Sequence, residues 1–221
     1  MCSSDLIDVK GKVDLKGRGQ DVELQNIDGQ VTVTGTYVGQ TQLRNLSQPL
    51  RYEDPTITLN CEKLPGQVHM GTGEFTGENL IGPVRLNARS RDVNLSEFTQ
   101  SAEVTIERGD VTLRPGKTVP KIEVHTRSGD LDLALPAGAR FDLKASTDRG
   151  EVHNDYGSPL AIDESHRGGT IAGVSGGGPQ VRLETGRGAL TIRKMTDEAV
   201  TFPSIPNSPN APKPPSTPIR Q

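Results

Sequence analysis

Short alternations of apolar and polar residues dominate the chain between Val84 and Val152. Each has the form apolar-x-apolar, as in Val93-Asn94-Leu95 and Val104-Thr105-Ile106. Because successive side chains of a strand point to opposite faces, this period of two predicts short strands with one buried face. No convincing amphipathic helix appears, so the pattern predicts an all-β protein.

The strand units form two alternating sets. One set follows a bend that carries an acid and usually glycine: Arg91-Asp92-Val93-Asn94-Leu95, Arg108-Gly109-Asp110-Val111, Ser128-Gly129-Asp130-Leu131 and Arg149-Gly150-Glu151-Val152. The other set lies between the bends: Val84-Arg85-Leu86, Val104-Thr105-Ile106, Ile122-Glu123-Val124 and Phe141-Asp142-Leu143. Each set recurs about every 20 residues, which predicts a β-strand-repeat solenoid, β-helix-like, with about two strands per coil. An antiparallel meander is the alternative, since this spacing also suits hairpins.

Stacking of the coils assigns inward columns to the apolar residues. We expect one column of Val84, Val104, Ile122 and Phe141, and a second column of Val93, Val111, Leu131 and Val152. Leu131 then lies between Val111 and Val152, whereas Thr112 faces outward. The same rhythm continues after Val152 through Ile171 and Leu190. Between Leu43 and Pro55 it loosens, and Pro49 and Pro55 predict a longer loop there.

The chain divides into three parts. Residues 1–6 precede a strand pattern that begins abruptly, and Cys2-Ser3-Ser4-Asp5-Leu6 is what one frame of a common sequencing adapter encodes. We expect them to be a non-native or disordered start to a fragment. Residues 7–202 form the solenoid domain, in which 199–202 are a candidate last strand. Residues 203–221 contain seven prolines, and this Pro-rich tail is predicted to be disordered or extended, acting as a spacer.

Composition limits the core and the partners. Hydrophobic residues make up 32% of the chain, aromatic residues only 3%, and 25 residues are glycine, which favours a narrow core of Val, Leu and Ile. The net charge is −3 with acids and bases interspersed, so no basic stripe indicates nucleic-acid binding. The chain lacks an apolar run of about 18 residues, so it contains no membrane span.

Candidate catalytic chemistry is sparse. Cys61 is interpreted as a small strand residue, and no Cys/His cluster has zinc spacing. His69, His125 and His153 alternate with apolar residues and are expected to face solvent, and His166 is a fourth, isolated histidine. No Ser/His/Asp order stands out, and sugar-stacking aromatic residues are few. The sequence predicts a protein that is not an enzyme and has no cofactor and no metal.

The acids of the bends form the one repeated polar constellation. Stacked coils would place Asp92, Asp110, Asp130 and Glu151 about 4.8 Å apart. Such a column of like charges needs neutralisation, and Arg91, Arg108, Arg127 and Arg149 precede these acids by one to three residues. We predict a structural corner ladder of interleaved arginines and acids. Calcium binding is the functional alternative, although the Gly-Gly-x-Gly-x-Asp repeat is missing.

The tripeptide Arg108-Gly109-Asp110 is interpreted as one of these bends rather than a receptor-binding motif.

These motifs resemble a bacterial family. The likeness runs from about Ile7 to Lys194, and it rests on Asn79-Leu80-Ile81-Gly82-Pro83-Val84, Arg89-Ser90-Arg91-Asp92-Val93, the bends above and Ser128-Gly129-Asp130-Leu131-Asp132-Leu133-Ala134-Leu135-Pro136. The family is the adhesin-like β-strand-repeat family, a domain of unknown function. The resemblance implies an extracytoplasmic or cell-envelope location, although the anchor typical of members is not present in this sequence.

Three functional hypotheses follow. The first is a non-enzymatic envelope β-solenoid, adhesin-like or a scaffold, whose partners are envelope components or other copies of itself. The second is a polymerising cytoskeletal scaffold similar to the bactofilins, which also combine a β-helix with Pro-rich tails. The third is a polysaccharide-active enzyme on a β-helix.

Overall fold

The computed structural model describes residues 3–164 and 167–195, and within them the chain forms 21 strands in two sheets and no helix. The ten-stranded sheet contains, in spatial order, β1 (Ser4–Ile7), β3 (Val22–Ile27), β5 (Thr41–Leu46), β8 (Leu64–Met70), β9 (Glu74–Glu78), β11 (Asp92–Ser96), β13 (Val111–Arg114), β15 (Leu131–Leu135), β21 (Leu190–Lys194) and β17 (Val152–Asp155). The eleven-stranded sheet contains β18 (Ala161–Glu164), β19 (Gly169–Ser175), β16 (Phe141–Thr147), β20 (Gln180–Thr185), β14 (Ile122–Thr126), β12 (Ala102–Arg108), β10 (Val84–Ser90), β7 (Ile57–Cys61), β6 (Leu50–Asp54), β4 (Val31–Tyr37) and β2 (Val13–Gly19).

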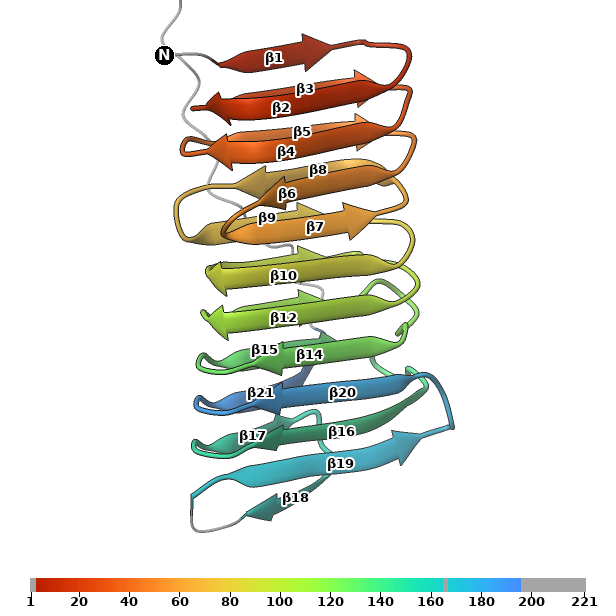
Figure 1. The fold of residues 1–221 in the computed structure, drawn as a ribbon. Coiled ribbons are helices and arrows are strands. Elements are labelled where there is room, and N and C mark those ends of the chain that lie inside the picture. Colours follow the sequence, from red (N-terminus) through yellow and green to blue (C-terminus); the bar gives the residue numbers. More distant parts are fainter. Residues whose placement is uncertain (1–2, 165–166, 196–221) are drawn as a thin grey trace, which may run out of the picture.

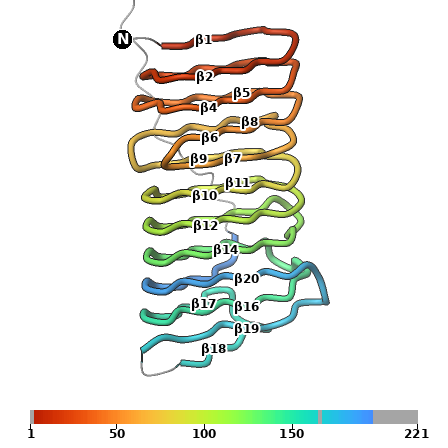
Figure 2. Tube along the Cα trace, in the orientation of Figure 1, coloured from red at the N-terminus to blue at the C-terminus, as the bar shows by residue number. Residues whose placement is uncertain are grey.

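Except at the consecutive pairs β6–β7 and β8–β9 and at β18–β20, the chain alternates between the two sheets, so a typical coil supplies one strand to each of them. Figures 1 and 2 show the coils stacked from β1 and β2 at one end to β18 at the other. Most neighbouring strands are parallel, as in β10 with β12 and β11 with β13. The predicted two-strand solenoid is therefore confirmed, and the meander is not the dominant arrangement.

The core is a thin double layer of apolar side chains between the sheets. Apolar residues of both expected columns are buried, among them Val84, Val104, Val111 and Leu131. Thr112 is only half-buried on the outer face, as expected. The layer is thin, so Val, Leu and Ile side chains fill most of it, and few aromatic residues are needed.

The expected columns were wrong in register at several points. Val84 pairs with Ala102 rather than Val104, and Ile122 pairs with Ala102 as well. In β16 it is Leu143, not Phe141, that lies in the Ile122 column, through Val181. Val93, Val111 and Leu131 do pair in order. Apolar residues recur every second position along each strand, so the pattern alone does not distinguish registers two residues apart.

One coil runs in the reverse direction. Strand β7 is antiparallel to β6 and β10, and β8 is antiparallel to β5 and β9. The reversal after β6 is made by a tight turn in which the Asp54 carboxylate accepts hydrogen bonds from the Thr56 N–H (2.8 Å) and hydroxyl (2.7 Å). The longer loop expected between Leu43 and Pro55 was wrong, because β5 and β6 occupy most of this segment and bury Leu50 and Tyr52.

The last strand pair is inserted between two earlier coils. Strand β20 lies between β14 and β16, and β21 lies between β15 and β17, as the blue coil in Figure 1 shows. Leu131 therefore contacts Val111 on one side and Leu190 on the other, and the expectation that Val152 adjoins it was wrong. The reversal between β19 and β20 uses Gly176 and Gly177, with φ of 62° and 61°.

The ends of the domain depart in part from the expectation. Residues 4–6 belong to β1, where Asp5 and Leu6 pair with Glu23 and Leu24, so they are not disordered. The candidate strand at 199–202, the Pro-rich tail at 203–221, Cys2 and His166 lie outside the described residues. Among the described residues, no helix is long and apolar enough to cross a membrane.

Candidate functional site at the repeated corner

A column of glycines shapes the corner that connects the two sheets. Gly109, Gly129, Gly188 and Gly150 are stacked neighbours, and their φ angles lie between 135° and 149°. A Cβ added to Gly129 would lie 1.9 Å from the Gly109 carbonyl oxygen, and one added to Gly188 would lie 2.1 Å from the Gly129 carbonyl oxygen. The bend therefore requires glycine both for its backbone angle and for the close approach of the next coil.

Buried threonines support the same corner from inside. Thr126, Thr185 and Thr147 pair with one another in successive coils, and all three are buried. The Thr185 hydroxyl donates to the Gly129 carbonyl (3.1 Å), and the Thr147 hydroxyl donates to the Gly188 carbonyl (2.9 Å). Among the described residues, the Thr126 hydroxyl is a buried polar atom without a hydrogen bond.

The acids of the corner ladder are held by main-chain amides. The Asp92 carboxylate accepts from the Asp110 N–H (2.9 Å), and the Asp110 carboxylate accepts from the Asp130 N–H (2.8 Å). The Asp130 carboxylate accepts from the Ala189 N–H at 2.7 Å. Each carboxylate thus binds the coil after its own, and these charge-assisted bonds join successive coils.

The arginines of the predicted ladder do not alternate with these acids. All eight residues (Arg91, Asp92, Arg108, Asp110, Arg127, Asp130, Arg149 and Glu151) lie at the corner, but the arginines occupy three different columns. Arg91 lies in the glycine column, Arg108 lies one position before it, and Arg127 lies two positions before it. Among the described residues, no ion pair joins these arginines to these acids, and Ala189 separates Asp130 from Glu151.

Individual contacts explain two members of this set. The Arg91 guanidinium donates to the carbonyl oxygen of Gly71 and, at 3.4 Å, to that of Glu74, so it ties β11 to the turn before β9. In Arg108-Gly109-Asp110, the acid is engaged with Asp130 and the glycine is packed against the preceding coil. This tripeptide is therefore a structural corner in this fold, as its place in the repeat predicts.

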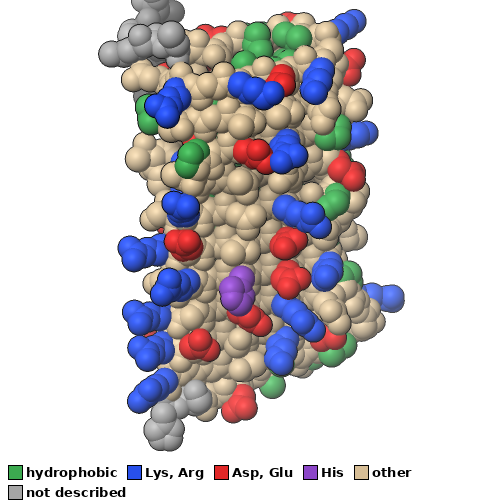
Figure 3. Space-filling model, viewed as in Figure 1, with side chains coloured by type: hydrophobic (Ala, Val, Ile, Leu, Met, Phe, Trp, Pro, Cys, Tyr) green, Lys and Arg blue, Asp and Glu red, His purple; other side chains and the backbone are tan. Residues whose placement is uncertain are grey.

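Arginines at the two positions that precede the glycine column line a groove at the corner. Its seven lining residues enclose about 530 Å³ and are Arg89, Ser90, Glu107, Arg108, Arg127, Ser128 and Arg187; we refer to them as the arginine groove. They lie at the ends of β10, β12 and β14 and after β20, which occupy adjacent coils. In Figure 3, Lys and Arg side chains follow one another along the left edge of the lower half, where these corners lie in Figure 1.

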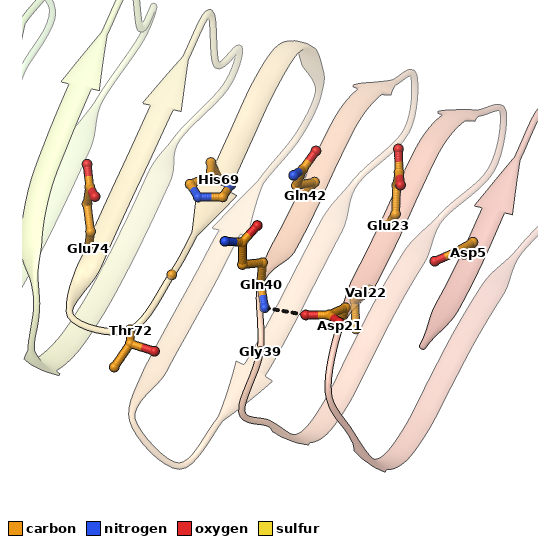
Figure 4. Close-up of a pocket in the computed structure, with 11 residues that line it drawn as sticks. Asp5, Asp21, Val22, Glu23, Gly39, Gln40, Gln42, His69, Thr72 and Glu74 are labelled. Carbon is orange, nitrogen blue, oxygen red and sulfur yellow. Dashed lines mark hydrogen bonds between the residues drawn. The ribbon is translucent and has the colours of Figure 1, made fainter. Parts of the chain in front are cut away.

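A second hollow, of about 710 Å³, lies over the ten-stranded sheet near the N-terminal end. Asp5, Asp21, Glu23 and Glu74 supply four carboxylates and His69 an imidazole, from β1, β3, β8, β9 and the turn before β3 (Figure 4). Asp21 is already used, because its carboxylate accepts from the Gln40 N–H at 2.8 Å, the dashed line in Figure 4. Among the described residues, no group of three or more His, Cys, Asp or Glu could hold a metal ion.

The other candidate residues from the sequence, two histidines and Cys61, have contacts or burial that give no sign of catalysis. His125 Nδ1 lies 3.0 Å from the Glu184 carboxylate, and His153 Nε2 lies 3.4 Å from that of Glu151. Both histidines face outward, as predicted. Burial raises the pKa of the Cys61 thiol to about 12, so this cysteine remains a neutral strand residue near neutral pH.

Sequence reasoning did not single out two of the four arginines of the arginine groove, Arg89 and Arg187, or its one acid, Glu107. A signal for Arg187 was present, because Thr185-Gly186-Arg187-Gly188-Ala189-Leu190 has the same Thr-x-x-Gly-x-apolar form as the segments that begin at Thr126 and Thr147. Ala189 stands where the other copies of the bend carry Asp130 or Glu151, so the search for an acid after the glycine did not find this copy. Arg89 belongs to the motif Arg89-Ser90-Arg91-Asp92-Val93, but it lies at the exposed end of an ordinary strand unit, and nothing in that motif indicates that it adjoins other arginines.

The parallel coils define a β-solenoid domain, and one glycine bend recurs at four of its corners. The chain belongs to the Toastrack family, DUF4097, whose model matches residues 3–193. This result agrees with the predicted β-strand-repeat domain of unknown function, and the family description contains no reference to adhesion. No curated protein and no solved structure matches the chain.

Proposed function

We propose that the domain is a non-enzymatic, adhesin-like scaffold of the cell envelope, which presents its long strand faces to envelope components or to other copies of itself. The observation that carries this proposal is the repetition of the exterior. Outward residues pair in register from coil to coil, as Glu103 does with Glu123 and Asn94 does with Thr112. A partner that is itself repetitive can contact such a surface at many equivalent points.

The shape of the domain supports a binding role. The parallel ladders and the buried apolar layer make the solenoid a preformed surface, so binding requires little ordering of the protein. The outer faces carry exposed ion pairs such as Arg85 with Glu103 (3.2 Å), and pairs of this kind add little stability. Their positions can therefore serve contacts with a partner without loss of the fold.

The test is co-sedimentation of the purified protein with bacterial envelope fractions, together with native mass measured across a wide concentration range. Sedimentation with envelopes, or a reversible increase in mass with concentration, is the expected result. A monomer at every concentration that also stays in the supernatant would contradict the proposal. Open-ended growth into filaments would instead favour the polymerising, bactofilin-like scaffold. Release of sugars from a glycan panel would favour the polysaccharide-active enzyme.

A further inference from the structure

The arginine groove contains four arginines that form no ion pair within the part of the chain that the structure describes. The guanidinium groups of Arg89, Arg108, Arg127 and Arg187 make no hydrogen bond and no ion pair with the described residues. All four residues are exposed. By contrast, Arg85, Arg51 and Arg193 each have a carboxylate partner within 4 Å. Glu107 is the one acid among the lining residues, so the groove carries a net charge of about +3 at neutral pH.

The fold sets the spacing of these cations. Each arginine comes from a different coil, because β10, β12, β14 and β20 are consecutive neighbours in the eleven-stranded sheet. Strands in a sheet are about 4.8 Å apart, so the four positions span roughly 14 Å along the solenoid axis. Ser90 pairs with Arg108, and Ser128 and Arg187 continue that column, so hydroxyls alternate with guanidiniums.

The geometry points to a linear anionic polysaccharide as the ligand of the arginine groove. Guanidinium groups bind carboxylate or phosphate oxygens through two parallel hydrogen bonds, and a row of them matches anions that repeat along a chain. The serine hydroxyls between them can donate to and accept from sugar hydroxyls. None of the seven lining residues is aromatic, so the groove lacks the stacking surface that single-stranded nucleic acid requires.

The acids nearby do not cancel this preference. The carboxylates of Asp92, Asp110 and Asp130 follow the glycine column, whereas the arginines and serines of the groove precede it. Each of these carboxylates is already bound to a main-chain N–H of the next coil. Glu107 is different, because it lies within the groove and has no ion-pair partner among the described residues. It should therefore weaken the binding of an anion.

This inference names one partner class for the proposed envelope function. It takes only the location of the partner from that proposed function, whereas the chemistry of the ligand is inferred from the groove itself. The probes are polygalacturonate, which carries carboxylates, and a phosphomannan, which carries phosphates; the tighter of the two identifies the oxyanion. Dextran is the neutral control, and oligothymidylate is the nucleic-acid control. Affinities of the full chain are measured by isothermal titration calorimetry at low salt and at physiological ionic strength.

We expect wild-type protein to bind at least one anionic probe and not dextran, with weaker binding as salt rises. The double variant Arg108→Gln/Arg127→Gln should bind at least tenfold more weakly. The variant Glu107→Gln should bind the anionic probe at least about twofold more tightly than wild type, a gain that a folding defect would not produce. The control Arg18→Gln/Arg182→Gln removes the same charge from exposed positions of β2 and β20 outside the groove and should lower affinity by less than twofold.

Several outcomes would overturn the inference. These are absence of binding to both anionic probes, equal losses in the groove and control variants, unchanged affinity in Glu107→Gln, or tighter binding of oligothymidylate. A groove variant that has lost polysaccharide binding but still sediments with envelopes as wild type does would refute the groove as the envelope contact and leave the proposed function standing. Wild-type protein that binds the polysaccharide but does not sediment with envelopes would refute the envelope function and leave the groove standing.

Discussion

Replacement of Gly129 by alanine tests whether the glycine column holds the coils together. The φ angle of Gly129 is 147°, and an added Cβ would lie 1.9 Å from the Gly109 carbonyl oxygen. A side chain in this backbone region costs about 1–3 kcal/mol. Relief of the contact would also stretch two hydrogen bonds, Gly129 N–H to the Arg187 carbonyl (2.8 Å) and Gly109 N–H to the Ser128 carbonyl (3.0 Å), each worth about 1 kcal/mol.

The expected total is a loss of about 3–5 kcal/mol, which for a domain of this size corresponds to a fall in Tm of roughly 6–20 °C. Thermal unfolding followed by far-ultraviolet circular dichroism measures it. Gly116→Ala is the matched control, because nothing lies within 4 Å of its added Cβ and its φ is not positive. It should change stability by less than about 1 kcal/mol. A Tm of Gly129→Ala within 2 °C of wild type would refute the account of the corner.

Three further predictions concern the core and the corner. Leu131→Asp places a carboxylate at a position that is 2% exposed, and it should lower the free energy of unfolding by roughly 3–5 kcal/mol in chemical denaturation. Thr112→Asn on the outer face should be nearly silent, and equal denaturation midpoints for the two variants would contradict the assignment of the inward columns. Asp110→Ala removes the acceptor of the Asp130 N–H and should cost roughly 1 kcal/mol, and Asp110→Asn should restore part of it; no difference between them would mean that the bond contributes nothing. In a Cys2→Ser background, the Cys61 thiol, whose pKa burial raises to about 12, should react with a disulfide reagent only after unfolding, and rapid labelling of the native protein at pH 8 would disprove its burial.

The sequence by itself determined the local structure and the repeat. Alternation of period two, as in Val111-Thr112-Leu113, specifies which side chains are buried, and the structure buries them. The Gly-Asp bends at Gly109 and Gly129 mark corners because only glycine adopts the required backbone and allows the next coil to approach. These are properties of a few neighbouring residues, so they can be read from a single chain.

Only the tertiary structure decided which coils are neighbours and in what register. Leu190 fits between Leu131 and Val152, which the sequence repeat would have stacked directly on each other, because the corners at Gly129, Gly188 and Gly150 each present the same glycine and a similar apolar residue to the next coil. A repeated surface accepts many orders of stacking with similar local energy, and the reversals at Asp54 and at Gly176 select one of them. The arginine groove depends on that selection. Arg187 joins Arg108 and Arg127 only because β20 is inserted beside β14, a long-range choice that no local pattern records.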